Sequence, residues 1–395
     1  MELVFVLTVK IILILKLEKE LLTQNIKINN MKKLRILAVE THWKTNGEKI
    51  VTSGVDFCRI VLPLQELSKN PDFEVKIVKD PFKDNEETWD SLTKYYDIIY
   101  SSYIDSPEGY INMKMFADKN NCKVIIDCDD NMFKVPKASP VYETYHIGSF
   151  PLDVVAKVIE DTEYLTTTNS FLKYEFIEWC KKRPEQIKCL PNFIDLSRYN
   201  KDNIKPKDND KIVISFHGSN THVVDLVMPE FLNAITRIIK EFPNVEFHTT
   251  GLFLPHLKTR MGKQYKFILG HADVYSWASK LWPEMMQNAD IVVAPLVQSD
   301  FSKSKSGIKF LENSAGMKPG VYENIRQYQE FYRQDGEALL LAETEYEWYR
   351  ELKKLVENEQ LRKDMGKRAY ELVKNKYQMK DNVYLYADYF KSLVR

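Results

Sequence analysis

The chain has 395 residues, a length that accommodates two or three domains. It carries 56 basic and 56 acidic side chains, so a net charge of zero provides no overall field toward nucleic acid, and no nucleic-acid partner is expected. Hydrophobic residues make up 44% and charged residues 28%, which is typical of a globular protein and excludes a disordered one. Five scattered cysteines argue against a disulfide framework and favour a reducing, cytoplasmic setting.

Residues 1–30 are predicted to be an extension outside the fold. Their apolar run, 3–17, is interrupted by two lysines and is shorter than the roughly 18 residues that a membrane span needs. No basic segment precedes the run and no small-residue cleavage site follows it, so it differs from a secretion signal. A loosely attached helix is the main interpretation, and a helix lying on a membrane surface is the alternative.

Residues 31–197 alternate short apolar runs with helical patterns, which predicts βαβ units around a parallel sheet. The first strand, at 34–39, leads through a polar loop into a helix over 55–67. The other expected strands of this half span 73–78, 97–100, 123–126, 164–168 and 187–190, with helices at 107–120 and 171–180.

A polar segment, residues 198–210, separates this half from the next and is the best linker in the chain. A second alternating series then predicts another α/β domain over 211–379, closed by a helix at 380–395. Its expected strands span 212–216, 245–249, 289–294 and 338–341, with helices at 226–242, at 308–315 and from 345 nearly to the end.

Loops that follow strands are the candidate binding positions, because parallel sheets bind ligands at the carboxyl ends of their strands. Ser53 and Gly54 open the helix that carries Arg59. A glycine there admits the close approach of a ligand, and a helix N-terminus favours an anion. A capping serine followed by a tolerant glycine is the alternative interpretation.

Asp127, Asp129 and Asp130 directly follow the strand predicted at 123–126. Carboxylates this close repel one another, so they imply a metal, hydrogen-bond donors or open solvent. Helix capping and turn formation are the structural alternatives.

His217, Gly218 and Ser219 follow the first strand of the second half. Small residues with free N–H groups can cradle a phosphate there. His217 and His222 could ligate a metal, but no carboxylate or cysteine stands at a matching spacing, so no metal is expected.

The most informative segment follows the strand at 289–294. Lys305 and Lys309 stand four residues apart and would share one face of a helical turn. Ser306 and Gly307 stand where a helix N-terminus would direct backbone donors outward, and Lys303 adds a third cation. This combination predicts a diphosphate site, and a solvated basic loop is the alternative. Glu312, one turn further, could accept hydrogen bonds from two ribose hydroxyls.

Several passages, in this order and spacing, resemble GT-B glycosyltransferases of the family 4, group 1 kind over roughly residues 32–390. They are Ser53-Gly54-Val55 with Pro63, Asp127 to Asp130 with Phe133, Pro191-Asn192-Phe193-Ile194-Asp195, His217-Gly218-Ser219, and Lys305 to Glu312 followed by Gly316-Met317-Lys318-Pro319. The resemblance implies an α/β fold of two Rossmann-like domains whose parallel sheets face a central cleft. The C-terminal half would bind a nucleoside diphosphate-sugar, the N-terminal half would bind the acceptor, and the last helix would cross back to the first domain.

The implied activity is transfer of a hexose to a hydroxyl of a glycan, a lipid-linked sugar or another acceptor, as in polysaccharide biosynthesis, without a metal or other cofactor. Asp127, Asp129 and Asp130 would be candidates for the base or for acceptor contacts. The donor would be bound by Gly54, His217, Gly218, Ser219, Lys303, Lys305, Ser306, Gly307, Lys309 and Glu312.

One departure concerns the family's Glu-x7-Glu motif, whose first glutamate contacts the donor sugar in related enzymes. This chain has Ser304 at that position, so the sugar stays open and a retaining mechanism is implied by analogy alone. Three alternatives remain: a nucleotide-sugar epimerase, a non-catalytic nucleotide-sugar-binding protein, and a DNA-base glucosyltransferase, against which the zero net charge argues.

Overall fold

The structure is a computed structural model that describes residues 33–42, 44–46, 49–79, 86–104, 106–199, 210–270 and 288–394. The expected extension at 1–30 and most of the expected linker, 200–209, lie outside the described residues. None of the described helices is both long and apolar enough to cross a membrane.

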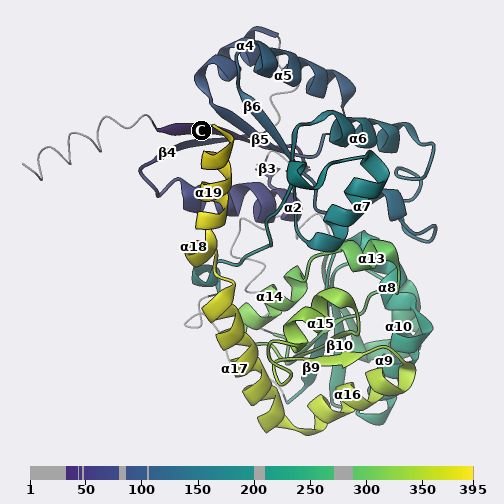
Figure 1. Cartoon of the computed structure of the whole chain (residues 1–395). Coiled ribbons are helices and arrows are strands. Elements are labelled where there is room, and N and C mark those ends of the chain that lie inside the picture. Colours follow the sequence, from purple (N-terminus) through teal and green to yellow (C-terminus); the bar gives the residue numbers. More distant parts are fainter. Residues whose placement is uncertain are drawn as a thin grey trace, which may run out of the picture.

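The first half of the chain builds a sheet of six parallel strands in the order β4–β1–β5–β6–β7–β8 (Figure 1). Its central strand β5 is buried at all of its positions, as expected for a parallel sheet with helices on both faces. The strands are β1 (Leu34–Glu40), β4 (Phe73–Lys79), β5 (Ile98–Ser102), β6 (Lys123–Asp127), β7 (Tyr164–Thr167) and β8 (Ile187–Cys189).

The helix expected over 55–67 is not uniform. It starts as α2 (Gly54–Asp56), widens into a π-helical turn, η1 (Phe57–Val61), and ends as α3 (Leu62–Leu67). Such π turns inside helices are frequent at functional sites. The other elements of this half are the short antiparallel pair β2 (Lys44–Asn46) and β3 (Lys49–Val51), and helices α4 (Glu86–Tyr95), α5 (Pro107–Lys119), α6 (Phe150–Asp161) and α7 (Ser170–Cys180).

The second half builds another sheet of six parallel strands, in the order β11–β10–β9–β12–β13–β14. Together the two sheets confirm the expected α/β architecture. The strands are β9 (Ile212–His217), β10 (Val245–Gly251), β11 (Tyr265–Gly270), β12 (Ile291–Ala294), β13 (Gly320–Glu323) and β14 (Leu340–Ala342). The helices before β14 are α8 (Val223–Val227), α9 (Pro229–Glu241), α10 (Pro255–Met261), α13 (Asp300–Ser304), α14 (Ile308–Ala315) and α15 (Arg326–Tyr332).

Two long helices that the sequence predicts are divided in the structure. The helix expected over 226–242 is split by Met228, whose extended backbone (ψ 133°) follows from the proline that comes next. The C-terminal helix becomes α16 (Glu345–Glu357), α17 (Glu359–Lys376), α18 (Met379–Asn382) and α19 (Tyr384–Leu393).

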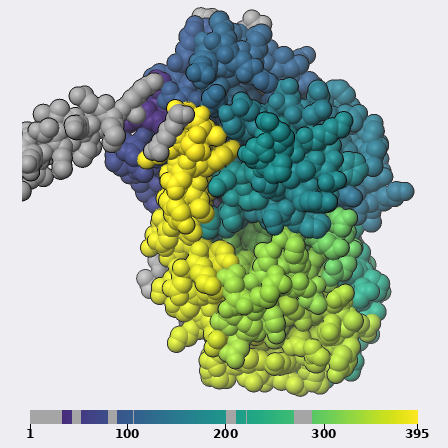
Figure 2. All heavy atoms as spheres, in the orientation of Figure 1, coloured from purple at the N-terminus to yellow at the C-terminus, as the bar shows by residue number. Residues whose placement is uncertain are grey.

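The C-terminal segment joins the two halves. Figure 1 shows α17 beside the second sheet and α19 beside the first, and Figure 2 shows this segment running along one side of both halves. Tyr386 and Phe390 of α19 pack in one buried cluster with Ile36 and Tyr100 of the first sheet. The backbone of Ile194 exchanges hydrogen bonds with Tyr377 and Met379, so the connection between the halves is itself braced by this segment.

Candidate functional site

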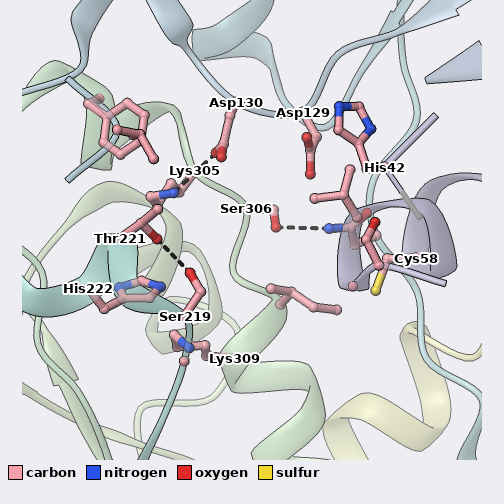
Figure 3. A pocket seen from close by; sticks show the side chains of 18 of the residues that line it. His42, Cys58, Asp129, Asp130, Ser219, Thr221, His222, Lys305, Ser306 and Lys309 are labelled. Carbon is pink, nitrogen blue, oxygen red and sulfur yellow. Dashed lines mark hydrogen bonds and ion pairs between the residues drawn. The ribbon is translucent and has the colours of Figure 1, made fainter. Parts of the chain in front are cut away.

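A cavity of about 420 Å³ lies between the two halves and is lined by residues of both (Figure 3). Its lining includes loops that follow β1, β6, β9 and β12, which places it at the carboxyl ends of the strands of both sheets. Among the residues that the sequence predicts, the lining contains Gly54, Asp129, Asp130, Gly218, Ser219, Lys305, Ser306, Lys309 and Glu312. Four others do not line it: Asp127, His217, Lys303 and Gly307.

Lys309 lies beneath the loop that follows β9. Its ammonium donates to the carbonyl of His217 and lies 5.1 Å from the centroid of the Phe216 ring. Burial lowers the pKa of Lys309 to about 8. A Cβ added to Gly218 would come within 3.1 Å of the Lys309 Nζ, so the absence of a side chain lets backbone and cation meet. This corner of the cavity combines a half-buried cation with a glycine-bearing loop, which suits an anion. The N–H of Gly218 itself is occupied, because it donates to the Thr250 carbonyl at 3.1 Å.

The four-residue spacing predicts that Lys305 and Lys309 share one face of a helix, but the structure does not place them so. Lys305 lies between α13 and α14 in extended backbone (ψ 152°), because α14 begins only at Ile308. Its Nζ lies 3.2 Å from Asp130 Oδ1, on the other side of the cavity, and 4.3 Å from the Phe301 ring centroid. The two lysines therefore reach the cavity from different directions, one of them tied to the first half.

Three further residues that the sequence predicts to bind the donor lie outside the cavity lining. The side chain of Lys303 is 42% exposed and lies near Asp300 on α13. Gly307 caps α14, and a Cβ there would approach Phe331 to 2.3 Å, so packing explains this glycine. The His217 ring is buried, and burial together with the Lys309 charge holds the pKa of His217 well below its usual value.

Glu312 is a carboxylate on the wall that the second half contributes. It is buried, lines the cavity, and its Oε2 lies 3.8 Å from His217 Nε2. Gly54, on the opposite wall, also lines the cavity, while its neighbour Ser53 caps α2 by accepting the Asp56 N–H at 3.1 Å. The capping interpretation of Ser53 is therefore confirmed, and the approach of a ligand to Gly54 stays a prediction.

The contacts of Asp127 rule against its prediction as a base. Its carboxylate forms a two-pronged ion pair with the buried Arg59, at 2.9 Å (Nε–Oδ1) and 2.7 Å (Nη2–Oδ2). The hydroxyls of Thr166 and Tyr100 also donate to it, at 2.5 Å and 3.0 Å. A carboxylate with four donors inside the core is a structural brace and has no lone pair directed at a substrate.

The other two aspartates remain at the cavity. Asp130 pairs with Lys305, whereas the pKa of Asp129 is raised to about 7, chiefly by burial and then by the neighbouring charges of Asp130 and Asp127. The repulsion expected between the three carboxylates is thus relieved by an arginine, by a lysine and by partial protonation. Asp129 is the member of the three whose protonation changes near neutral pH.

Some cavity residues were not predicted as site residues. His42 follows β1 and faces the cavity near Asp129 (Figure 3). Asn192 lines the same space and donates to Ser306 Oγ at 2.9 Å. His222 does have a carboxylate partner close by in the sequence, contrary to the prediction. Its Nδ1 lies 2.7 Å from Oδ2 of Asp225, three residues later in the chain. Burial and the Lys309 charge lower the pKa of His222 to about 4, so its ring is neutral near pH 7.

No group of three or more histidine, cysteine, aspartate or glutamate side chains that could hold a metal ion occurs among the described residues. His222 and Asp225 form a pair only.

No protein-family model matches the chain, and no curated protein matches it. Several solved structures do match the chain. HepE of Anabaena in complex with UDP and glucose has a TM-score of 0.63 at 15% identity, over 91% of this chain and 100% of that one. Sucrose-phosphate synthase of Thermosynechococcus elongatus has a TM-score of 0.62 at 12% identity, over 91% and 99%. A candidate UDP-N-acetylglucosamine 2-epimerase of Listeria monocytogenes has a TM-score of 0.51 at 12% identity, over 89% and 94%. The chain therefore has the two-domain fold of these proteins.

Proposed function

We propose that the protein transfers a sugar from a nucleoside diphosphate-sugar to an acceptor hydroxyl. The observation that carries the proposal is the division of one cavity into two unlike walls. The wall from the second half holds Lys309 and Lys305, together with Gly218 and Ser219 of the loop after β9, a set suited to a diphosphate. The wall from the first half holds His42 and Asp129, which can contact a hydroxyl. HepE, which has this fold, binds UDP and UDP-glucose, and this adds support.

The lysines would act on the leaving group. Cleavage of the bond between the sugar and the diphosphate leaves negative charge on the phosphate, and cations fixed in advance lower the barrier. A charge-assisted hydrogen bond of this kind contributes about 1.5–3 kcal/mol. Lys309 is held in place by the His217 carbonyl, so it needs little rearrangement. We propose that these cations replace a metal and that Glu312 accepts hydrogen bonds from the ribose.

The stereochemical outcome depends on the acceptor wall. Retention, which the family resemblance implies, needs no protein base, because the departing phosphate can take the acceptor proton on the same face of the sugar. Inversion needs a base on the opposite face. Ser304, in place of the family's first glutamate, is fully buried and does not line the cavity. The donor wall therefore supplies no argument for retention.

Two rival functions predict different results. An epimerase would need acid–base groups around the donor sugar, yet among the described lining residues of the second half Glu312 is the sole carboxylate. An epimerase would convert the donor without an acceptor, which nuclear magnetic resonance of the donor alone detects. A non-catalytic binding protein would bind the donor but would not convert it, whichever acceptor is offered.

Thermal unfolding with UDP, GDP, ADP, CMP and their sugar conjugates, with and without magnesium, tests the proposal. A ligand at 100 times its Kd adds about 2.7 kcal/mol of stability, and about 1 kcal/mol raises the midpoint of a chain this size by about 2–4 °C. We expect one diphosphate to raise the midpoint without magnesium in the wild type and in Lys303→Ala, and Lys309→Ala and Lys305→Ala to lose most of the rise. A rise that needs magnesium, or none with any nucleotide, contradicts the metal-free donor site.

A further inference from the structure

His42 lies on the acceptor wall, and nothing in the proposed transfer yet uses it. Its side chain is 24% exposed and its ring contacts Tyr103, with the ring centroids 4.2 Å apart. Figure 3 shows it on the opposite side of the cavity from Lys309 and Ser219, next to Asp129. The ring therefore lies across the cavity from the cations that would hold the leaving diphosphate.

The hydrogen bonds behind the ring determine which nitrogen carries the proton. Thr41 Oγ1 donates its hydrogen to the carbonyl of Tyr103 at 3.0 Å. The same oxygen lies 3.0 Å from His42 Nδ1, and because its hydrogen is already used it can only accept there. His42 must therefore be protonated at Nδ1. In the neutral ring, Nε2 then has a free lone pair.

A buried carboxylate supports the same nitrogen. Asp56 is fully buried, accepts the backbone N–H of His42 at 2.7 Å, and its Oδ1 lies 3.5 Å from Nδ1. Ser102 Oγ also donates to it. Asp56 thus holds the backbone of His42 and lies behind the ring, on its Nδ1 side. The arrangement is that of a histidine oriented to act as a base toward the cavity.

We propose that His42 Nε2 takes the proton of the acceptor hydroxyl, an inference that rests on the proposed glycosyl transfer. As the acceptor oxygen bonds to the anomeric carbon, the bond from that carbon to the diphosphate oxygen breaks. The proton passes to His42, and the electron pair of the broken bond leaves with the diphosphate toward Lys309 and Lys305. Because base and leaving group lie on opposite sides of the cavity, the configuration of the sugar is inverted.

An anionic nucleophile tests the base directly, because azide has no proton to lose. The assay uses UDP-glucose with either methyl glycosides or sodium azide, and it compares wild type with His42→Gln and Asp129→Asn. The control is His146→Gln, at a partly exposed histidine outside the cavity lining. We expect His42→Gln to lose about 100-fold or more of hydroxyl transfer. Transfer to azide and UDP binding should stay within about threefold of wild type, and wild type should convert the α-linked donor to β-glycosides.

Three results overturn the proposal: unchanged hydroxyl transfer in His42→Gln, an equal loss with azide, or α-glycosides from the wild type. Selective loss in Asp129→Asn with His42→Gln unaffected would overturn it as well and assign the base to Asp129. If the wild type neither binds UDP nor transfers to either nucleophile, the proposed function itself fails. That result is distinct from wild-type transfer that does not depend on His42.

Discussion

Asn192 Nδ2 donates a 2.9 Å hydrogen bond to Ser306 Oγ, across the cavity between the two halves of the chain. The same amide accepts from Arg59 Nη1 through its Oδ1 at 2.8 Å, and Arg59 is held by Asp127. One asparagine thus connects the buried ion pair of the first half to Ser306, two residues before the start of α14. The position of this helix start is thereby set partly by the core of the first half.

We expect Asn192 and Ser306 to be energetically coupled. Replacing each by alanine, singly and together, should reveal a coupling of about 0.5–1.5 kcal/mol, the net contribution of one hydrogen bond. Urea unfolding of the four proteins measures it. Asn233→Ala, at an exposed hydrogen bond to Glu345, is the matched control and should be additive with Ser306→Ala. Additivity within error for Asn192 and Ser306 would show that the link has no energetic consequence.

The Arg59–Asp127 pair provides a second prediction. Arg59→Met leaves the Asp127 carboxylate buried without its arginine, which should lower the free energy of unfolding by about 3–5 kcal/mol. The double variant Arg59→Met/Asp127→Leu removes both charges and should recover a large part of that loss. Urea unfolding compares the two. A double variant that is less stable than the single one would mean that the hydroxyls of Thr166 and Tyr100, rather than the charge pair, dominate this part of the core.

The surroundings of Ser304 leave no room for a glutamate. Its side chain is fully buried, and its Oγ and carbonyl accept from Asn131 at 3.0 Å and Asn169 at 2.7 Å, both residues of the first half. We therefore expect Ser304→Glu to force the halves apart, with a lower melting temperature and a larger radius of gyration in X-ray scattering. Ser304→Ala removes the two hydrogen bonds of the hydroxyl, one from Asn131 and one to the Asp300 carbonyl, and should leave the radius unchanged. A glutamate accommodated at wild-type stability would refute this account.

The sequence predicts the two sheets well, since buried parallel strands are short apolar runs between polar loops. It misses β11, and it misses β13, which is only four residues long and begins with a glycine. It also misses the helices α4, α6, α10, α13 and α15, and the serines and lysines of α13 carry no apolar periodicity. The helix α13 borders the site, since its Phe301 lines the cavity. α13 is marked locally only by Ser299, which accepts the N–H of Ser302 and so starts the helix.

The sequence predicts site residues whose positions depend on neighbouring residues in the chain. It misses those whose positions and roles depend on tertiary contacts. The loop that follows β9 and the start of α14 are local features, and the structure places Gly218 and Ser306 of these segments at the cavity. Asp127 looks like a catalytic carboxylate in sequence because its partner, Arg59, is 68 residues away. His42 gives no signal at all, since its orientation depends on Thr41, Tyr103 and Asp56 coming together in the fold.

The last prediction concerns pH and Asp129. Its pKa is about 7 in the fold, against 3.8 for an ordinary aspartate, so between these values the folded state binds more protons than the unfolded state. The contribution of Asp129 to stability is therefore greatest at low pH and is lost as the pH rises through about 7. Asp129→Asn imitates the protonated form and removes this dependence.

The melting temperature of Asp129→Asn should differ least from the wild type at pH 4.5 and should exceed it increasingly as the pH rises through about 7, because the carboxylate of the folded wild type is half charged there and becomes fully charged only above it. Scanning fluorimetry of both proteins across pH 4.5–8.5 measures the difference, in which contributions shared by both, such as that of His222, cancel. A difference that stays constant with pH would show that Asp129 keeps an ordinary pKa. Asp129 would then be ionised throughout this range and unable to donate a hydrogen bond to the substrate at neutral pH.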